Sequence, residues 1–143
     1  MRVADDHVFV ERFRRNVGKA LESTLGLEVE IRSGPRIVSQ AVITVSLAID
    51  ANQSGPIYWT IEQDVALELV KRLTEDPDPA ADMATDGATE LANILTGCAM
   101  HLFEEHGYRC ALGVPIVESG ELVVPSHGWL STSCGSIEFA FTH

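Results

Sequence analysis

One long amphipathic pattern constrains this chain more than any other feature of its sequence. From about Asp82 to His106 the residues favour a single helix, and Gly107 stands where helices commonly end. At about 100° per residue, one arc of this helix collects the apolar side chains of Ala88, Leu91, Ala92, Leu95, Cys98, Ala99, Leu102 and Phe103. The pattern predicts a central helix whose apolar arc faces the core.

Two more helices are predicted. The first runs from about Asp6 to Leu25, with Gly26 as the residue that ends it. The second begins at a capping box made by Thr60 and Gln63 and ends before the prolines of residues 76–79. Its inward-facing side chains are expected to be Val65, Leu69 and Leu73.

Short apolar segments between the helices predict strands. Alternation is clearest from Ile43 to Ile49, and turn-forming residues 50–55 make Ile57–Ile61 its hairpin partner. The other segments are Leu27–Ile31, Tyr108–Val114, Glu121–Val124 and Ser136–Phe141. Because helices and strands fall in blocks, we expect an α+β fold with two layers: an antiparallel or mixed sheet with helices on one face. The 143 residues fit a single domain, 1–143.

The charge balance argues against several classes of partner. The chain has 10 Lys and Arg against 21 Asp and Glu, a net charge of −11, which repels nucleic acid and anionic membranes. The N-terminus lacks the apolar region of a signal peptide, and the apolar run Ala41–Ile49 is too short to cross a bilayer. Three cysteines without CxxC spacing favour reduced thiols, with Cys98 buried on the apolar arc. We therefore expect a cytoplasmic protein.

The polar side of the long helix has an unusual composition. Asp86, Glu90, Asn93 and Gly97 share a stripe about 60° wide. Asn and Gly disfavour helix, and a mid-helix Gly costs roughly 1 kcal/mol relative to Ala. Since a bare backbone lets a partner approach closely, the stripe is a candidate functional surface, with Ile94 and Met100 as a docking rim on its two sides.

Two other motifs are weaker candidates. His101 and Glu105 are one turn apart and could chelate a metal, but the run to His106 has one residue too many for H-x-x-E-H, so solvated helix residues are the better interpretation. Residues 131–136 contain nucleophile types without the strand–turn–helix setting of a nucleophile elbow, which favours a turn between strands. No metal site is predicted.

The spacing Asp86-x3-Glu90-x2-Asn93-x21-Pro115 resembles the signature of the CheC/CheX/FliY chemotaxis phosphatases. The sequences of residues 55–67, 90–97 and 104–108 are also similar to the CheX branch, and the likeness spans nearly the whole chain. CheC-type members carry a second motif on their first helix. Here the residue three before Asn16 is Phe13 rather than Glu, so one site is expected.

The resemblance implies a CheC-like fold and hydrolysis of the aspartyl phosphate on a CheY-like receiver. Asn93 would position the attacking water, Glu90 would contact the active-site lysine of the receiver, and Asp86 would support that contact. Ile94, Gly97 and Met100 would belong to the docking surface, and Pro115 would form a structural corner beside the site. The protein would need no cofactor of its own, because the receiver supplies Mg²⁺.

Two alternatives remain: a catalytically inactive module that binds receivers, and a structural subunit of a signalling assembly. The resemblance also implies a homodimer through edge strands. Ser136–Phe141, with alternating Ile137, Phe139 and Phe141, is the expected edge.

Overall fold

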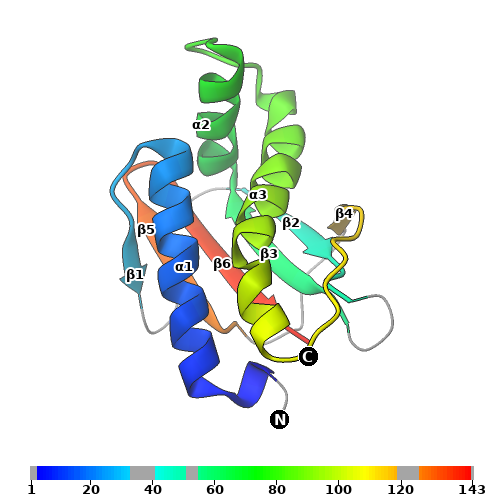
Figure 1. Ribbon diagram of the computed structural model, residues 1–143. Coiled ribbons are helices and arrows are strands. Elements are labelled where there is room, and N and C mark those ends of the chain that lie inside the picture. The colour runs from blue at the N-terminus through cyan, green and yellow to red at the C-terminus, as the bar shows by residue number, and fades with distance from the viewer. Residues whose placement is uncertain (1–2, 33–40, 51–54, 119–125, 143) are drawn as a thin grey trace.

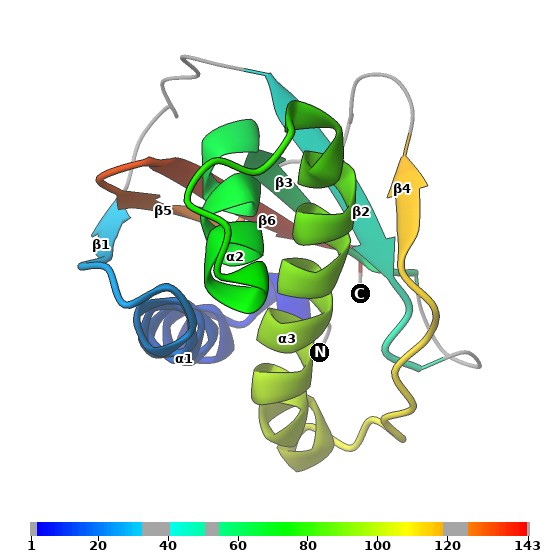
Figure 2. The same cartoon turned by 90° about the horizontal axis from the view of Figure 1, so that it is seen from above.

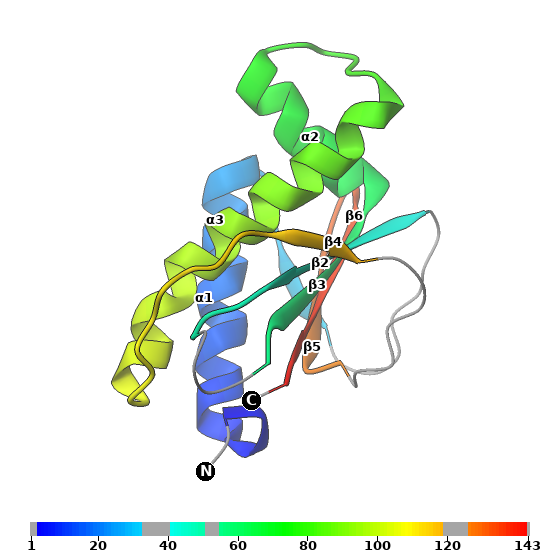
Figure 3. The same ribbon diagram turned by 90° about the vertical axis from the view of Figure 1, so that its right-hand side faces the viewer.

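Three α-helices cover one face of a six-stranded antiparallel sheet in the part of the chain that the computed structural model describes, residues 3–32, 41–50, 55–118 and 126–142 (Figures 1 and 3). The helical elements are η1 (Val3–Asp5), α1 (His7–Leu25), α2 (Gln63–Thr74), η2 (Ala81–Met83) and α3 (Ala84–Glu105). The strands are β1 (Glu30–Arg32), β2 (Val42–Leu47), β3 (Ile57–Glu62), β4 (Ile116–Glu118), β5 (Gly128–Thr132) and β6 (Gly135–Phe141). The predicted α+β architecture is confirmed.

The sheet has the strand order β1-β5-β6-β3-β2-β4, and every neighbouring pair is antiparallel. In the middle of the sheet, Trp59 is opposite Val45 on one side and Phe139 on the other. All three side chains are buried. They form part of the apolar face on which the helices pack.

A buried hydrogen bond joins α3 to this face. The indole Nε1 of Trp59 donates to Oγ1 of Thr96 over 2.9 Å, and that hydroxyl donates to the carbonyl oxygen of Ala92 over 2.7 Å. Both Trp59 and Thr96 are fully buried. A buried N–H left without a partner costs about 1–3 kcal/mol, so this bond strongly favours one rotation of α3 about its axis.

The termini of α1 match the sequence prediction. The carboxylate of Asp6 accepts hydrogen bonds from the backbone N–H groups of Val8 and Phe9, which caps the helix. Gly26 ends the helix at a φ of 67°, a left-handed conformation that favours glycine.

The entry to α2 differs from the prediction. Thr60 lies in β3, where its hydroxyl contacts that of Thr44, and Glu62 precedes the helix without a side-chain capping bond. The carboxylate of Glu62 instead accepts a hydrogen bond from the backbone N–H of Ser136. The predicted capping box is wrong because β3 runs directly into α2.

Two strand predictions are also wrong. Residues 108–114 form no strand, although the N–H groups of Ala111 and Gly113 donate to the carbonyls of Ile49 and Ala48. Strand β6 is not an edge, because it pairs with β3 on one side and β5 on the other. Residues 121–124 and most of the predicted turn at 50–55 lie outside the described residues.

Among the described helices, none combines the length and the apolar character that crossing a membrane requires.

Candidate functional site

The predicted stripe of α3 lies on its solvent side. Asp86, Glu90 and Gly97 are exposed, and Asn93 is partly buried. Within the described ranges, none of the three polar side chains is joined to another residue by an ion pair or a side-chain hydrogen bond. Two carboxylates and one carboxamide are therefore free to contact a molecule that approaches this face.

Gly97 leaves open space above the stripe. Apart from its chain neighbours and the backbone of its own helix, a Cβ built at this position would meet no atom of the described residues within 4 Å, so the fold itself does not require glycine here. Gly87 is the opposite case, because a Cβ there would lie 2.4 Å from the carbonyl oxygen of Ala66 in α2. Gly87 serves the packing of α2 against α3, whereas Gly97 leaves the outer surface accessible.

The two residues of the predicted docking rim, Ile94 and Met100, are only partly exposed beside the stripe. Ile94 and Met100 are partly buried and pack against the core cluster, which leaves only part of each side chain beside the stripe. Pro115 is partly buried immediately before β4. The segment from α3 to β4 returns along the side of α3 in both Figure 1 and Figure 2, so the signature proline follows a segment that borders the helix.

Cys98 is exposed, so the prediction of a buried thiol is wrong. The position lies at the margin of the apolar arc, about 120° from Asp86, whereas the centre of the arc at Leu95 is fully buried. Whether a marginal position is covered depends on the neighbouring elements, which helical periodicity does not report.

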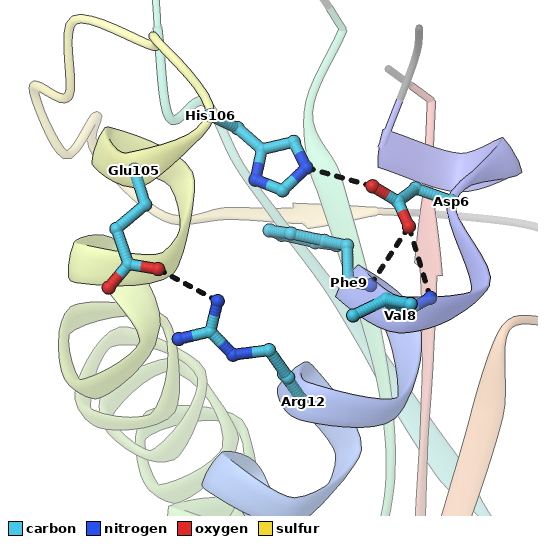
Figure 4. Close-up of polar contacts among 6 residues, drawn as sticks. All are labelled: Asp6, Val8, Phe9, Arg12, Glu105 and His106. Atoms are coloured by element: carbon cyan, nitrogen blue, oxygen red, sulfur yellow. Dashed lines mark hydrogen bonds and ion pairs between the residues drawn. The ribbon is translucent and has the colours of Figure 1, made fainter.

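The residues of the H-x-x-E-H-like run contact α1. Nε2 of His106 lies 2.9 Å from Oδ2 of Asp6, and Glu105 forms an ion pair with Arg12 over 2.8 Å (Figure 4). The His106 contact and the N–H of Phe9 lower the pKa of Asp6, and the Arg12 guanidinium lowers the pKa of Glu105. These pairs join the start of α1 to the end of α3.

The other weak candidate, residues 131–136, forms the tight connection between β5 and β6. Oγ1 of Thr132 donates to the carbonyl oxygen of Gly135 and accepts from the N–H of Cys134. The predicted turn between strands is confirmed.

One feature beside the stripe was not predicted from the sequence. A recess of about 250 Å³ lies between the end of α2 and the start of α3, and its lining includes Leu73 and Met83 together with Asp86 and Glu90. The exposed fraction of Leu73 is 62%, although helical periodicity placed it on the inward side of α2. No sequence signal marks the recess, because Leu73 continues the i, i+4 spacing of buried Val65 and Leu69, and only the neighbouring elements decide whether it is covered.

The family described as "Chemotaxis phosphatase CheX" matches residues 43–131, well over half of the chain. This chain belongs to the CheX family. The matched segment contains nearly all of β2, all of α2 and all of α3, and therefore the whole polar stripe. The search among curated proteins gave no match.

Solved structures share the fold of this CheX-family chain. The chemotaxis protein CheX from Vibrio vulnificus has a TM-score of 0.68 and 19% identity, over 93% of this chain and 98% of that one. A chain of the CheX-CheY-BeF3-Mg²⁺ complex from Borrelia burgdorferi has a TM-score of 0.64 and 16% identity, over 94% and 96% of the two chains. A chain of the FliG-FliM complex from H. pylori has a TM-score of 0.60 and 11% identity, over 96% and 94%. At these identities the likeness shows the fold alone.

The two glycines of α3 predict opposite effects on stability. Gly97→Ala adds a methyl group in open space and should raise the free energy of unfolding by about 0.5–1 kcal/mol. Gly87→Ala forces α2 and α3 apart and should lower it by about 1–3 kcal/mol. Urea unfolding followed by circular dichroism measures both. A loss of stability in Gly97→Ala would show that its outer face is not open.

Proposed function

We propose that this chain hydrolyses the aspartyl phosphate of a CheY-like receiver domain. The observation that carries the proposal is the stripe of α3, where exposed Glu90 and partly buried Asn93 have no ion pair or side-chain hydrogen bond in the described residues and lie beside the open space at Gly97. Polar side chains on an exposed helix face can act on a phosphoryl group that is attached to the surface of a partner protein. Membership of the CheX family supports a receiver as that partner, and so does the presence of CheY beside CheX in the Borrelia burgdorferi complex.

Asn93 would position the attacking water. Its carboxamide offers one oxygen acceptor and two N–H donors, and it does not titrate near neutral pH. The water oxygen attacks phosphorus in line with the bond to the receiver aspartate, that bond breaks, and the water proton passes to the released phosphate. The products are inorganic phosphate and a free aspartate carboxylate. Partial burial of Asn93 restricts its rotamers, which favours one orientation of the water.

Glu90 and Asp86 would hold the receiver in place. Glu90 is one turn before Asn93, and we assign it the contact with the active-site lysine of the receiver. Asp86, a further turn away, supports that contact. Ile94, Gly97 and Met100 would complete the docking surface.

Pro115 would fix the corner before β4 rather than take part in chemistry.

The receiver would supply the divalent metal. The Borrelia burgdorferi complex contains Mg²⁺ and BeF3, a group that stands in for the phosphoryl group. We therefore propose that this chain needs no cofactor of its own and acts as one domain, residues 1–143, in the cytoplasm, where receivers signal.

Loss of the Asn93 carboxamide should remove most of the acceleration of receiver dephosphorylation without abolishing receiver binding. Purified protein is mixed with phosphorylated CheY-type receivers of the same organism and Mg²⁺, and loss of phosphate is followed. Asn93→Ala should reduce the accelerated rate about 10²–10³-fold, the range observed for one positioned donor. Asn16→Ala is the matched control on α1, where no Glu precedes it by three residues, and it should retain activity. Binding to beryllofluoride-activated receiver should persist in both variants.

Receiver binding by the wild type without faster hydrolysis would contradict the phosphatase proposal and identify an inactive binding module. Equal activity of Asn93→Ala and the wild type would exclude Asn93 as the positioning group.

We also propose that two copies pair through β4. Of the two edges of the sheet in the described residues, β1 exposes one apolar side chain, Ile31, between charged Glu30 and Arg32, whereas β4 begins with two adjacent exposed apolar side chains, Ile116 and Val117. Exposed apolar side chains beside unpaired backbone groups form a template for a further strand. The antiparallel pairing of two β4 strands would give a two-fold dimer with a continuous sheet.

A charge at the β4 edge should separate the copies. Ile116→Lys should convert a dimer into a monomer in sedimentation equilibrium at micromolar concentration. Ile31→Lys places the same charge on the opposite edge and should leave the dimer intact. A wild-type monomer at every concentration, or dissociation by Ile31→Lys alone, would contradict pairing through β4.

A further inference from the structure

The recess beside the stripe lies where two helix ends project beyond the sheet. Figures 1 and 3 show the end of α2 and the start of α3 rising above the strands. The lining comes from both helices and from the end of η2: Val70, Leu73, Thr74, Met83, Asp86, Gly87 and Glu90. Two of these residues, Asp86 and Glu90, belong to the proposed receiver contact.

Rigid packing holds the walls of the recess. Gly87 lies in its lining, and the space for a Cβ there is already filled by the carbonyl oxygen of Ala66 and by the side chain of Val70. The two helices are therefore in backbone contact next to the recess. A partner would meet a preformed surface rather than two helices that must first be brought together.

The walls expose large apolar side chains. Leu73 is 62% exposed and Met83 is 37% exposed, whereas Val70 at the base is almost fully buried. Covering such a surface removes apolar area from water and favours association.

The charged part of the rim is entirely acidic. Asp86 and Glu90 are the charged residues of the lining. The sequence from residue 75 to residue 90 adds Glu75, Asp76, Asp78 and Asp82 and contains no Lys, Arg or His. The nearest cations on α2 are directed elsewhere, since Lys71 pairs with Glu68 and the guanidinium of Arg72 lies against Gly26. This surface is complementary to a partner segment that carries a basic residue beside an apolar one.

We propose that the recess binds an apolar side chain of the receiver, next to a second basic residue of the receiver, distinct from the active-site lysine assigned to Glu90, that faces the acidic lining at Asp86. This proposal rests on the proposed function, since Asp86 and Glu90 are shared between the recess and the stripe. A receiver that covers Glu90 and Asn93 also covers the mouth of the recess. The apolar anchor would fix the orientation of the receiver on α3, and the acidic rim would select receivers that carry the basic residue.

The test uses substitutions at exposed Leu73, which the fold does not need. Leu73→Ser removes the apolar wall, Leu73→Met retains it, and Val8→Ser is a matched control, because Val8 is a 70% exposed apolar residue on α1. Each variant is titrated with beryllofluoride-activated CheY-type receivers of the same organism, and dephosphorylation kinetics are measured with the phosphorylated forms. Circular dichroism melting verifies that each variant folds.

Leu73→Ser should weaken receiver binding and raise KM at least about tenfold while kcat stays within about twofold. Leu73→Met and Val8→Ser should both match the wild type. A Leu73→Ser variant with wild-type Kd and KM would overturn the recess proposal and leave the phosphatase function intact. The wild type could bind a receiver without dephosphorylating it, in which case the catalytic proposal fails. Weaker binding of Leu73→Ser to that receiver would still support the recess proposal. A wild type that binds no receiver overturns both.

Discussion

The position of the site depends on the hydrogen bond between Trp59 and Thr96. This bond directs Thr96 toward the sheet from the middle of α3. At about 100° per residue, Asn93 then lies about 60° from buried Thr96, whereas Glu90 and Gly97 lie about 140° and 160° from Leu95, the centre of the buried arc. These angles account for the partial burial of Asn93 and the exposure of the other two residues. The rotation of one helix thus divides its residues between the core and the stripe.

The division separates the packing face of α3 from the face to which we assign the proposed function. The buried arc, centred on Leu95, packs on the sheet and on α1 and α2, so substitutions there cost packing energy. The exposed stripe contributes little to packing, and its Asn93 and Gly97 even disfavour helix. Such a surface can present polar groups to a partner without a cavity of its own. Water is then excluded only when the partner docks, which strengthens each polar contact at the moment of reaction.

Local sequence patterns predicted the features that depend on one element at a time. The limits of α1, with Asp6 at its start and Gly26 at its end, follow from capping chemistry, and the stripe of α3 follows from helical periodicity. The errors arise where a neighbouring element decides whether a side chain is covered or whether a strand is paired on both sides. Cys98 and Leu73 have apolar-face spacing, but the neighbouring elements in the described part of the chain leave both exposed. The alternation in strand β6 allows an edge position without requiring one, and β5 pairs with its second side. The order of strands is a property of the whole sheet, and no segment of the sequence contains it.

The proposed function requires that the stripe of α3 is the face that contacts the receiver. Amide chemical shifts of the ¹⁵N-labelled protein, recorded before and after addition of beryllofluoride-activated receiver and Mg²⁺, test it most directly. We expect the largest changes between residues 86 and 97, including the side-chain amide of Asn93. Changes confined to α1 or to the sheet, with residues 86–97 unaltered, would contradict it.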